Sequence, residues 1–231
     1  MKPFVFQKFT IQQSEKVFRV GTDGVLLGAL SDVSKANKIL EVGAGTGLIS
    51  LMIAQRNPKA EITALDINED SAMLAGGNFS SSPFSERLKV ISADFKTFET
   101  KSKFDLIVSN PPYFEENESE KDILARQKVE LGFTDLIKKS SELLAENGIL
   151  SVIIPFSSGE EFIKEAQQFQ FNLIRKITIY GIKDSKPKRL VLEFSPNQSI
   201  LKEEEFIIEK SPRVYSEQYL ELTKDFHVFK K

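Results

Sequence analysis

The tetrapeptide Asn110-Pro111-Pro112-Tyr113 is the segment whose residue types most directly suggest chemistry. Two consecutive prolines fix φ, remove two N–H donors and leave rigid carbonyls free to accept hydrogen bonds. An asparagine oxygen and a proline carbonyl can each accept one hydrogen of an exocyclic amine, and an aromatic ring can stack on the flat group that bears it. Holding both hydrogens aims the nitrogen lone pair at an electrophile, which is catalysis by positioning. The alternative is a structural strand stop with Tyr113 packed as an ordinary aromatic.

A second candidate is the glycine-rich segment Gly43-Ala44-Gly45-Thr46-Gly47, preceded by Glu41. It lies between an apolar run and a helical pattern, and such a turn lets a ligand approach the backbone and the N–H groups of a helix start. The dinucleotide fingerprint G-x-G-x-x-G requires glycine where this chain has Leu48. The spacing therefore points away from a pyrophosphate ligand.

Two acids follow the next two apolar runs. Asp66 ends the run 61–67, where a carboxylate can accept both ribose hydroxyls of a nucleoside, although a helix N-cap is the alternative. Asp94 follows the run 88–93 and could accept from an adenine amino group, with Phe95 lining the ring, although a solvated turn explains it equally well. The two acids and the glycine segment together favour a nucleoside-containing ligand.

Composition excludes several other chemistries. The chain of 231 residues has no cysteine and one histidine, His227, which removes thiol nucleophiles and zinc ribbons and leaves no basis for a His-based metal site or triad. No metal is expected. The N-terminus lacks a signal-peptide pattern, and the apolar run 149–156 is far shorter than the ~20 residues of a membrane-spanning helix. We therefore expect a cytoplasmic protein without a membrane partner.

The remaining chain predicts the elements that position these residues. Apolar, β-branched runs predict strands, and helical patterns separate most of them, which favours an α/β fold with a mostly parallel sheet covered on both faces. Seven strands are predicted, at 38–42, 61–67, 88–93, 104–109, 148–154, 173–180 and 190–194. Helices are predicted at 22–32, 48–55, 69–78, around 136–144 and at 159–169, the last with a capping box formed by Ser158 and Glu161.

Connection lengths refine the topology. About nine residues separate the last two predicted strands, too few for a helical crossover, so we expect an antiparallel hairpin at the sheet edge. The first and fourth strands of a doubly wound sheet flank its switch point, which would place Asn110 beside the glycine segment. We expect one domain over residues 1–231, in which an aromatic and helical extension, 1–37, packs on a catalytic core, 38–231.

Taken together, these motifs resemble the class I S-adenosylmethionine-dependent methyltransferases, specifically the Rossmann-like amino-methyltransferases with a D/N/S-P-P-Y/F/W motif. The run Val20–Ala29 (VGTDGVLLGA), the Phe-rich start, the run Lys186–Arg189 (KPKR) and the ending around Tyr215–Tyr219 extend the resemblance over essentially the full chain. It is strongest to bacterial enzymes that methylate N6 of adenine 37 in valine tRNA. The start, Phe6-Gln7-Lys8-Phe9, departs from that pattern, as does an unusually acidic segment at 114–122.

The resemblance implies S-adenosyl-L-methionine as cofactor and the anticodon stem-loop of a tRNA as partner. We expect the protein to be a monomer, although the sequence does not establish its oligomeric state. It implies that Asn110, Pro111, Pro112 and Tyr113 hold the target amine. The implied cofactor residues are Thr22, Glu41, Gly43, Gly45, Gly47, Asp66, Ile67, Asp94, Phe95 and Asn110. Enzymes that act on a base need it unstacked, and anticodon-loop bases are already partly exposed.

The charge distribution suggests where RNA phosphates would bind. The net charge is −2, but residues 175–190 hold six basic side chains against one acid. Such a run is equally often only a solvated face. The predicted RNA-binding residues are Arg126, Lys183, Lys186, Lys188 and Arg189.

Three other functions remain open at this stage. A methyltransferase acting on a protein glutamine amide, or on an adenine of rRNA or DNA, would hold its amine in the same way. A nicotinamide-dependent oxidoreductase is disfavoured by the glycine spacing. A non-catalytic RNA-binding scaffold would keep the fold without needing Asn110.

Overall fold

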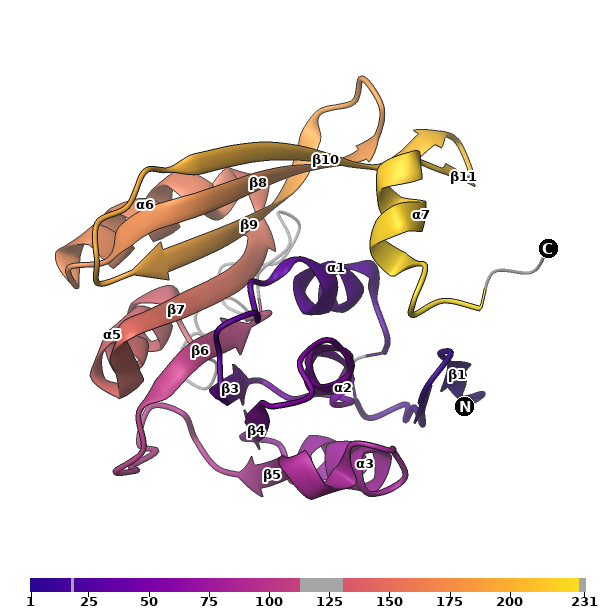
Figure 1. Ribbon diagram of the computed structural model, residues 1–231, viewed down its shortest axis with the longest axis horizontal. Helices are drawn as coiled ribbons and strands as arrows, with labels where there is room; N and C mark the ends of the chain where they lie inside the picture. Colours follow the sequence, from indigo (N-terminus) through magenta and orange to yellow (C-terminus); the bar gives the residue numbers. More distant parts are fainter. Residues whose placement is uncertain (18, 113–130, 229–231) are drawn as a thin grey trace, which may run out of the picture.

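The computed structural model describes residues 1–17, 19–112 and 131–228, and within them one large sheet forms the centre of the molecule. Its strands are β3 (Lys38–Val42), β4 (Glu61–Asp66), β5 (Leu88–Ser92), β6 (Phe104–Ser109), β7 (Leu144–Pro155), β8 (Asn172–Ile182), β9 (Pro187–Ser195), β10 (Lys202–Ser211) and β11 (Val214–Tyr215). Figure 1 shows the sheet, whose order is β11-β10-β8-β9-β7-β6-β3-β4-β5. All seven predicted strands are present.

Strands β3 to β7 pair in parallel, as expected where helices connect consecutive strands. Val42, the last residue of β3, lies opposite Leu65 of β4 on one side and Ser109 of β6 on the other. The segments that follow these strands therefore leave the sheet at one edge, called here the carboxyl edge. The expectation that the first and fourth predicted strands are neighbours is confirmed.

Helices cover both faces of the sheet: α1 (Thr22–Leu30), α2 (Leu48–Arg56), α3 (Glu69–Ser80) and α7 (Glu217–Thr223) on one, α5 (Phe133–Leu143) and α6 (Gly159–Gln168) on the other. Alternate strand residues enter the two cores. Ile39 and Leu106 pack with α1 and α2, whereas Leu40 and Ile107 pack with α5 and α6. This burial on both faces explains why the strands are continuous apolar runs.

Two strands of the large sheet, β10 and β11, were not predicted. The first half of β10 is Lys-Glu-Glu-Glu, which has no apolar alternation, yet it pairs in parallel with β8. Basic residues of β8 supply opposite charges across this ladder, which sequence periodicity cannot reveal. The predicted hairpin is formed by β8 and β9, which are antiparallel as expected. It does not lie at the sheet edge, because β9 also pairs with β7, and β10 and β11 continue the sheet beyond β8.

A smaller difference occurs at the start of α6. The short 3-10 turn η2 (Phe156–Ser158) leads directly into this helix, and the Ser158 side chain makes no capping hydrogen bond. The predicted capping box is therefore wrong, because Ser158 already has helical backbone angles instead of the extended ones of a side-chain cap.

The N-terminal extension packs on the rest of the chain. Strands β1 (Phe4–Val5) and β2 (Thr10–Ile11) form a two-stranded sheet, and Phe6 bridges to His227 near the C-terminus. Farther along, α1 packs closely on α2, because a Cβ at Gly28 would lie 3.0 Å from the Met52 side chain. Among the described residues, no helix has the length and apolarity needed to cross a membrane.

Candidate active site

The glycine segment forms a tight turn at the carboxyl edge, between β3 and α2. Gly43 and Ala44 both donate their N–H to the Leu65 carbonyl at 2.9 Å, and Gly47 donates to Ala44 at 2.7 Å. Gly43, Gly45 and Gly47 have φ of 82°, 53° and 78°, a region that favours glycine. The three glycines are therefore required by the backbone of the turn.

The same glycines face different surroundings. A Cβ on Gly43 or Gly45 would meet nothing within 4 Å, whereas one on Gly47 would lie 2.5 Å from the Phe79 ring. Gly47 thus permits close packing of the turn on α3. Gly43 and Gly45 border open space that a ligand could fill.

Asp66 is oriented toward this turn by two backbone amides. Its Oδ2 accepts from Gly45 N at 2.8 Å, and its Oδ1 accepts from Asn68 N at 2.9 Å. The N-cap of α3 is Asn68, which accepts from Ser71 N, so the capping alternative for Asp66 is wrong. The half-buried carboxylate retains acceptor capacity for ligand hydroxyls. Beside it, Ile67 is 57% exposed, as an apolar residue bordering a ligand site would be without the ligand.

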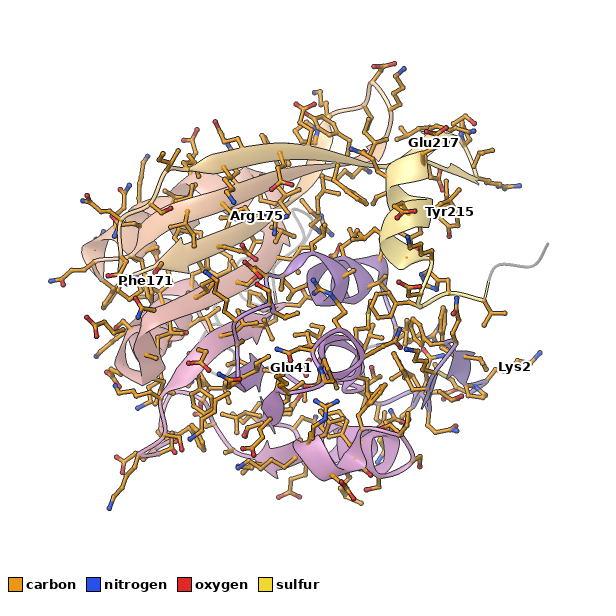
Figure 2. The ribbon with its side chains drawn as sticks, in the orientation of Figure 1. Lys2, Glu41, Phe171, Arg175, Tyr215 and Glu217 are labelled. Carbon is orange, nitrogen blue, oxygen red and sulfur yellow. The ribbon has the colours of Figure 1, made fainter. Side chains whose placement is uncertain are left out.

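Glu41 is the buried acid of the site, near the end of β3 and next to α2, as labelled in Figure 2. Its Oε2 accepts from the backbone N–H of Ser50 at 3.1 Å and from the Ser50 hydroxyl. Its Oε1 is buried and has no hydrogen-bond partner among residues 1–17, 19–112 and 131–228. Burial raises the pKa of Glu41 to about 8, and the nearby charge of Asp66 adds to that effect.

Asp94 and Phe95 follow β5 at the same edge. Ala93 N donates to the Asp66 carbonyl at 2.9 Å, which joins the two strand ends. Asp94 Oδ1 accepts from Lys96 N, and the Lys96 ammonium lies 3.9 Å from Asp94 Oδ2. Phe95 is only 4% exposed and packs in the core, which leaves little ring surface for an adenine. Asp94 is the better placed of the two for a ligand.

Asn110 lies directly after Ser109, whose hydroxyl donates to the Val42 carbonyl at 2.9 Å. This bond and the β3–β6 register bring the asparagine to the start of the glycine turn. Asn110 Oδ1 is buried and lacks a hydrogen-bond partner in the described part of the chain. Leaving such an acceptor unsatisfied costs about 1–3 kcal/mol, so a ligand that donates to it gains that energy. Pro111 is buried and Pro112 exposed, and Tyr113 lies outside the described residues.

Thr22 and Asp23 open α1. Thr22 is exposed, and its contact with a cofactor remains a prediction. Asp23 Oδ2 accepts from the Arg189 Nε at 2.9 Å, an ion pair between two residues far apart in the sequence.

The basic run 175–190 divides into two parts, one inside the sheet on β8 and one at the turn between β8 and β9. Arg175 and Lys176, early in β8, pair across the ladder with Glu204 and Glu203 of β10 at 2.6 and 2.9 Å. Arg175 also lies 3.6 Å from Glu193, and Figure 2 places it within the sheet. These two charges are thus locally balanced.

The other part lies at the carboxyl edge, because β8 runs parallel to β7 and ends there. The turn between β8 and β9 carries Lys183 and Lys186, and Lys188 follows as the second residue of β9; all three are exposed, and with this first part of β9 the segment is called here the β8–β9 turn. Arg189 begins the part of β9 that pairs with β7. Arg126 lies outside the described residues. This turn therefore brings three exposed lysines to the carboxyl edge.

Asn78 is a site residue that sequence reasoning missed. Its side chain is almost fully buried at 1% exposure; Nδ2 donates to the carbonyls of Thr46 and Gln12, and Oδ1 accepts from Gln12 N at 2.8 Å. It thus ties the glycine turn to the N-terminal extension. A single asparagine inside a predicted helix gives no signal of this contact.

A ligand suited to this arrangement can be described chemically. It would offer hydroxyls to Asp66, fit against backbone at Gly43 and Gly45, and present hydrogen-bond donors or positive charge to the unpartnered oxygens of Glu41 and Asn110. S-adenosylmethionine has a ribose, an α-ammonium group and a sulfonium, so the residues present fit it.

Comparison with known proteins agrees with this description. A family model described as the methyltransferase small domain matches residues 13–175. A tRNA1(Val) (adenine(37)-N6)-methyltransferase of a Flavobacteriaceae bacterium (strain 3519-10) is 59% identical over 230 residues, covering 99% of this chain and 100% of the relative. A protein of the same name from Flavobacterium psychrophilum is 42% identical, with 97% and 99% covered.

Solved structures share the fold. A predicted O-methyltransferase from Agrobacterium tumefaciens superposes with a TM-score of 0.71 at 22% identity, covering 88% of this chain and 96% of that one. A glycopeptide N-methyltransferase complexed with sinefungin gives a TM-score of 0.59 at 12% identity, covering 78% and 89%. At these identities the likeness concerns the fold alone.

Proposed function

The chain belongs to the methyltransferase small domain family, and on that premise we propose that it is an S-adenosylmethionine-dependent enzyme that methylates N6 of adenine 37 in a valine tRNA. The observation that carries the proposal is the buried, unpartnered Asn110 Oδ1 placed at the start of the glycine turn. An acceptor in that position suits an amine held beside a cofactor.

The chemistry assigned to the chain is positioning. Asn110 Oδ1 accepts one hydrogen of the adenine amino group, and the rigid Pro111 carbonyl is proposed to accept the other. The amine, otherwise weakly nucleophilic because its lone pair is delocalised into the ring, then directs that lone pair at the electrophile. Bound S-adenosylmethionine supplies a methyl carbon made electrophilic by a positive sulfur. The alkylated nitrogen is acidic and releases its extra proton to water, so no histidine is needed.

Cofactor binding is assigned to the residues around the glycine turn. Asp66, already oriented by Gly45 and Asn68, would hold the ribose hydroxyls, and Ile67 would contact the adenine ring. Glu41 would meet the positive end of the cofactor, where its Oε1 lacks a partner among the described residues. Asp94, Phe95 and Thr22 remain predicted cofactor residues, and Tyr113 a predicted stacking residue.

Substrate binding is assigned to the β8–β9 turn. Its exposed lysines, Lys183, Lys186 and Lys188, lie at the same edge as Asn110, where phosphates flanking an exposed base would pass. Inside the sheet the acids of β10 balance Arg175 and Lys176, so RNA phosphates have less attraction there. We place this reaction in the cytoplasm, where the tRNA is found.

The deciding experiment supplies labelled cofactor together with either a valine tRNA transcript or a peptide-chain release factor. A transcript with guanine at position 37 is the matched control. We expect label in N6-methyladenosine of the adenine transcript and none in the control. Label on the protein alone would instead support the glutamine-amide activity, and equal label in both transcripts would refute position 37.

A further inference from the structure

The ion pair between Asp23 and Arg189 joins two parts of the site that are 166 residues apart in sequence. The Arg189 Nε lies 2.9 Å from Asp23 Oδ2, with 28% and 21% of the two side chains exposed. At this partial burial the pair is less screened by solvent than an ordinary surface pair.

Asp23 belongs to the cofactor side of the site. It lies in the first turn of α1, which packs so closely on α2 that a Cβ at Gly24 would lie 3.1 Å from Leu48. Leu48 is the first residue of α2 and follows Gly47 directly. The position of Asp23 is therefore fixed relative to the glycine turn.

Arg189 belongs to the substrate side. It pairs with Pro155, the last residue of β7, so Pro187 and Lys188 of β9 lie beyond the end of the β7–β9 ladder. The β8–β9 ladder is irregular at this point: Arg189 lies opposite Ile179, and Pro187 opposite Tyr180, which skips Lys188. The turn with its lysines therefore extends from an irregular end of the β8–β9 ladder, while on its other side the Lys183 N–H donates to the Glu209 carbonyl of β10 at 2.9 Å.

We propose that Asp23 and Arg189 form a positioning pair that fixes the β8–β9 turn relative to the cofactor site. Arg189 then acts by holding the lysines in place, through Asp23 and through its bond to the Lys188 carbonyl at 3.1 Å, and does not itself bind phosphate. The inference rests on the proposed function, because it assigns the turn to RNA. It changes the role that the sequence predicted for Arg189.

The test is a double-mutant cycle of Asp23→Asn, Arg189→Gln and the double variant. Lys188→Gln serves as the phosphate-contact comparison, and Lys176→Gln as the matched control for loss of a positive charge outside the turn, where the ammonium pairs with Glu203. Turnover at saturating tRNA, the salt dependence of tRNA binding and cofactor affinity are measured for each. Hydrogen exchange of the amides within 183–188, of which Pro187 has none, reports on the turn without any substrate.

A positioning role predicts that each single variant loses kcat by ~10- to 100-fold, the effect of a misplacement of about 1 Å, and that the double variant loses no more than either single one. The salt slope should stay unchanged in Arg189→Gln and fall by about 0.7–0.9 in Lys188→Gln. Lys176→Gln should match the wild type. Exchange at 183–188 should quicken in Asp23→Asn.

Two results would overturn the inference. One is a fall of the salt slope in Arg189→Gln equal to that in Lys188→Gln, which would make Arg189 a phosphate ligand. The other is unchanged exchange at 183–188 in Asp23→Asn, since the turn would then not depend on the pair. If the wild type fails to methylate the tRNA but exchange quickens, the pair still positions the turn and the proposed function alone is refuted.

Discussion

Alanine substitution of the three glycines between β3 and α2 separates cofactor binding from folding. All three residues have positive φ, so each Gly→Ala change places a side chain in the left-handed region. Only at Gly47 would the new Cβ also overlap another group, the Phe79 ring at 2.5 Å, with Ala75 at 3.3 Å. At Gly43 and Gly45 the Cβ would enter the open space assigned to the cofactor.

These contacts set the expected magnitudes. The left-handed backbone costs an alanine roughly 1–2 kcal/mol, which applies to all three positions. Overpacking against Phe79 adds about 1–3 kcal/mol at Gly47 alone. For a chain of this size an extra ~2 kcal/mol lowers Tm by about 4–8 °C. We therefore expect Gly47→Ala to melt several degrees below Gly43→Ala and Gly45→Ala.

Calorimetry measures the melting temperature of each variant and its affinity for S-adenosylmethionine. Gly77→Ala is the matched control, because Gly77 lies in α3 with nothing within 4 Å of a Cβ; it should raise stability by roughly 0.5–1 kcal/mol without changing affinity. Gly45→Ala should lose cofactor affinity while it remains folded. Wild-type affinity in both Gly43→Ala and Gly45→Ala would refute the location of the cofactor, and equal Tm values for all three glycine variants would refute the packing role of Gly47.

Three further predictions concern the acid, the amine acceptor and the basic turn. Burial raises the pKa of Glu41 to about 8; the native state then holds this proton more tightly than the unfolded chain, so stability falls as pH rises from the ordinary range of a glutamate toward 8. Relative to Glu41→Gln, which cannot titrate, the wild type should lose Tm between about pH 5 and 8, and parallel curves for the two proteins would contradict this. Asn110→Ala should lower methyl transfer by about 100- to 1,000-fold while calorimetry shows nearly unchanged cofactor affinity; turnover at the wild-type rate would remove Asn110 from the mechanism. Replacing Lys186 and Lys188 together by glutamine should reduce the salt slope of tRNA binding by about 1.5, and an unchanged slope would place the phosphates elsewhere.

The local features of the site were readable from the sequence because single residues dictate them. Positive φ at Gly43, Gly45 and Gly47 requires glycine, so the residue types predict the turn. Strands buried on both faces, such as β3, β4 and β6, appear as apolar runs, and apolar β-branched runs predicted all seven strands. The general topology of doubly wound sheets then correctly placed Asn110 beside the glycine turn.

Features that depend on distant partners were decided by the tertiary structure. The charged start of β10 resembles a loop until Arg175 and Lys176 of β8 balance it across the ladder. Because β10 pairs with β8, the predicted hairpin does not lie at the sheet edge. Because acids of β10 pair with Arg175 and Lys176, the lysines of the β8–β9 turn are the part of the run 175–190 that we assign to RNA.

The same distinction applies within the site. Sequence alone could not distinguish Gly47, which packs against Phe79, from Gly45, which borders open space, since both are glycines of one turn. Nor could it pair Arg189 with Asp23, because nothing local to either residue specifies a partner 166 positions away. Backbone conformation is encoded residue by residue, whereas the partner of a side chain is fixed only when the sheet brings separate segments to one edge.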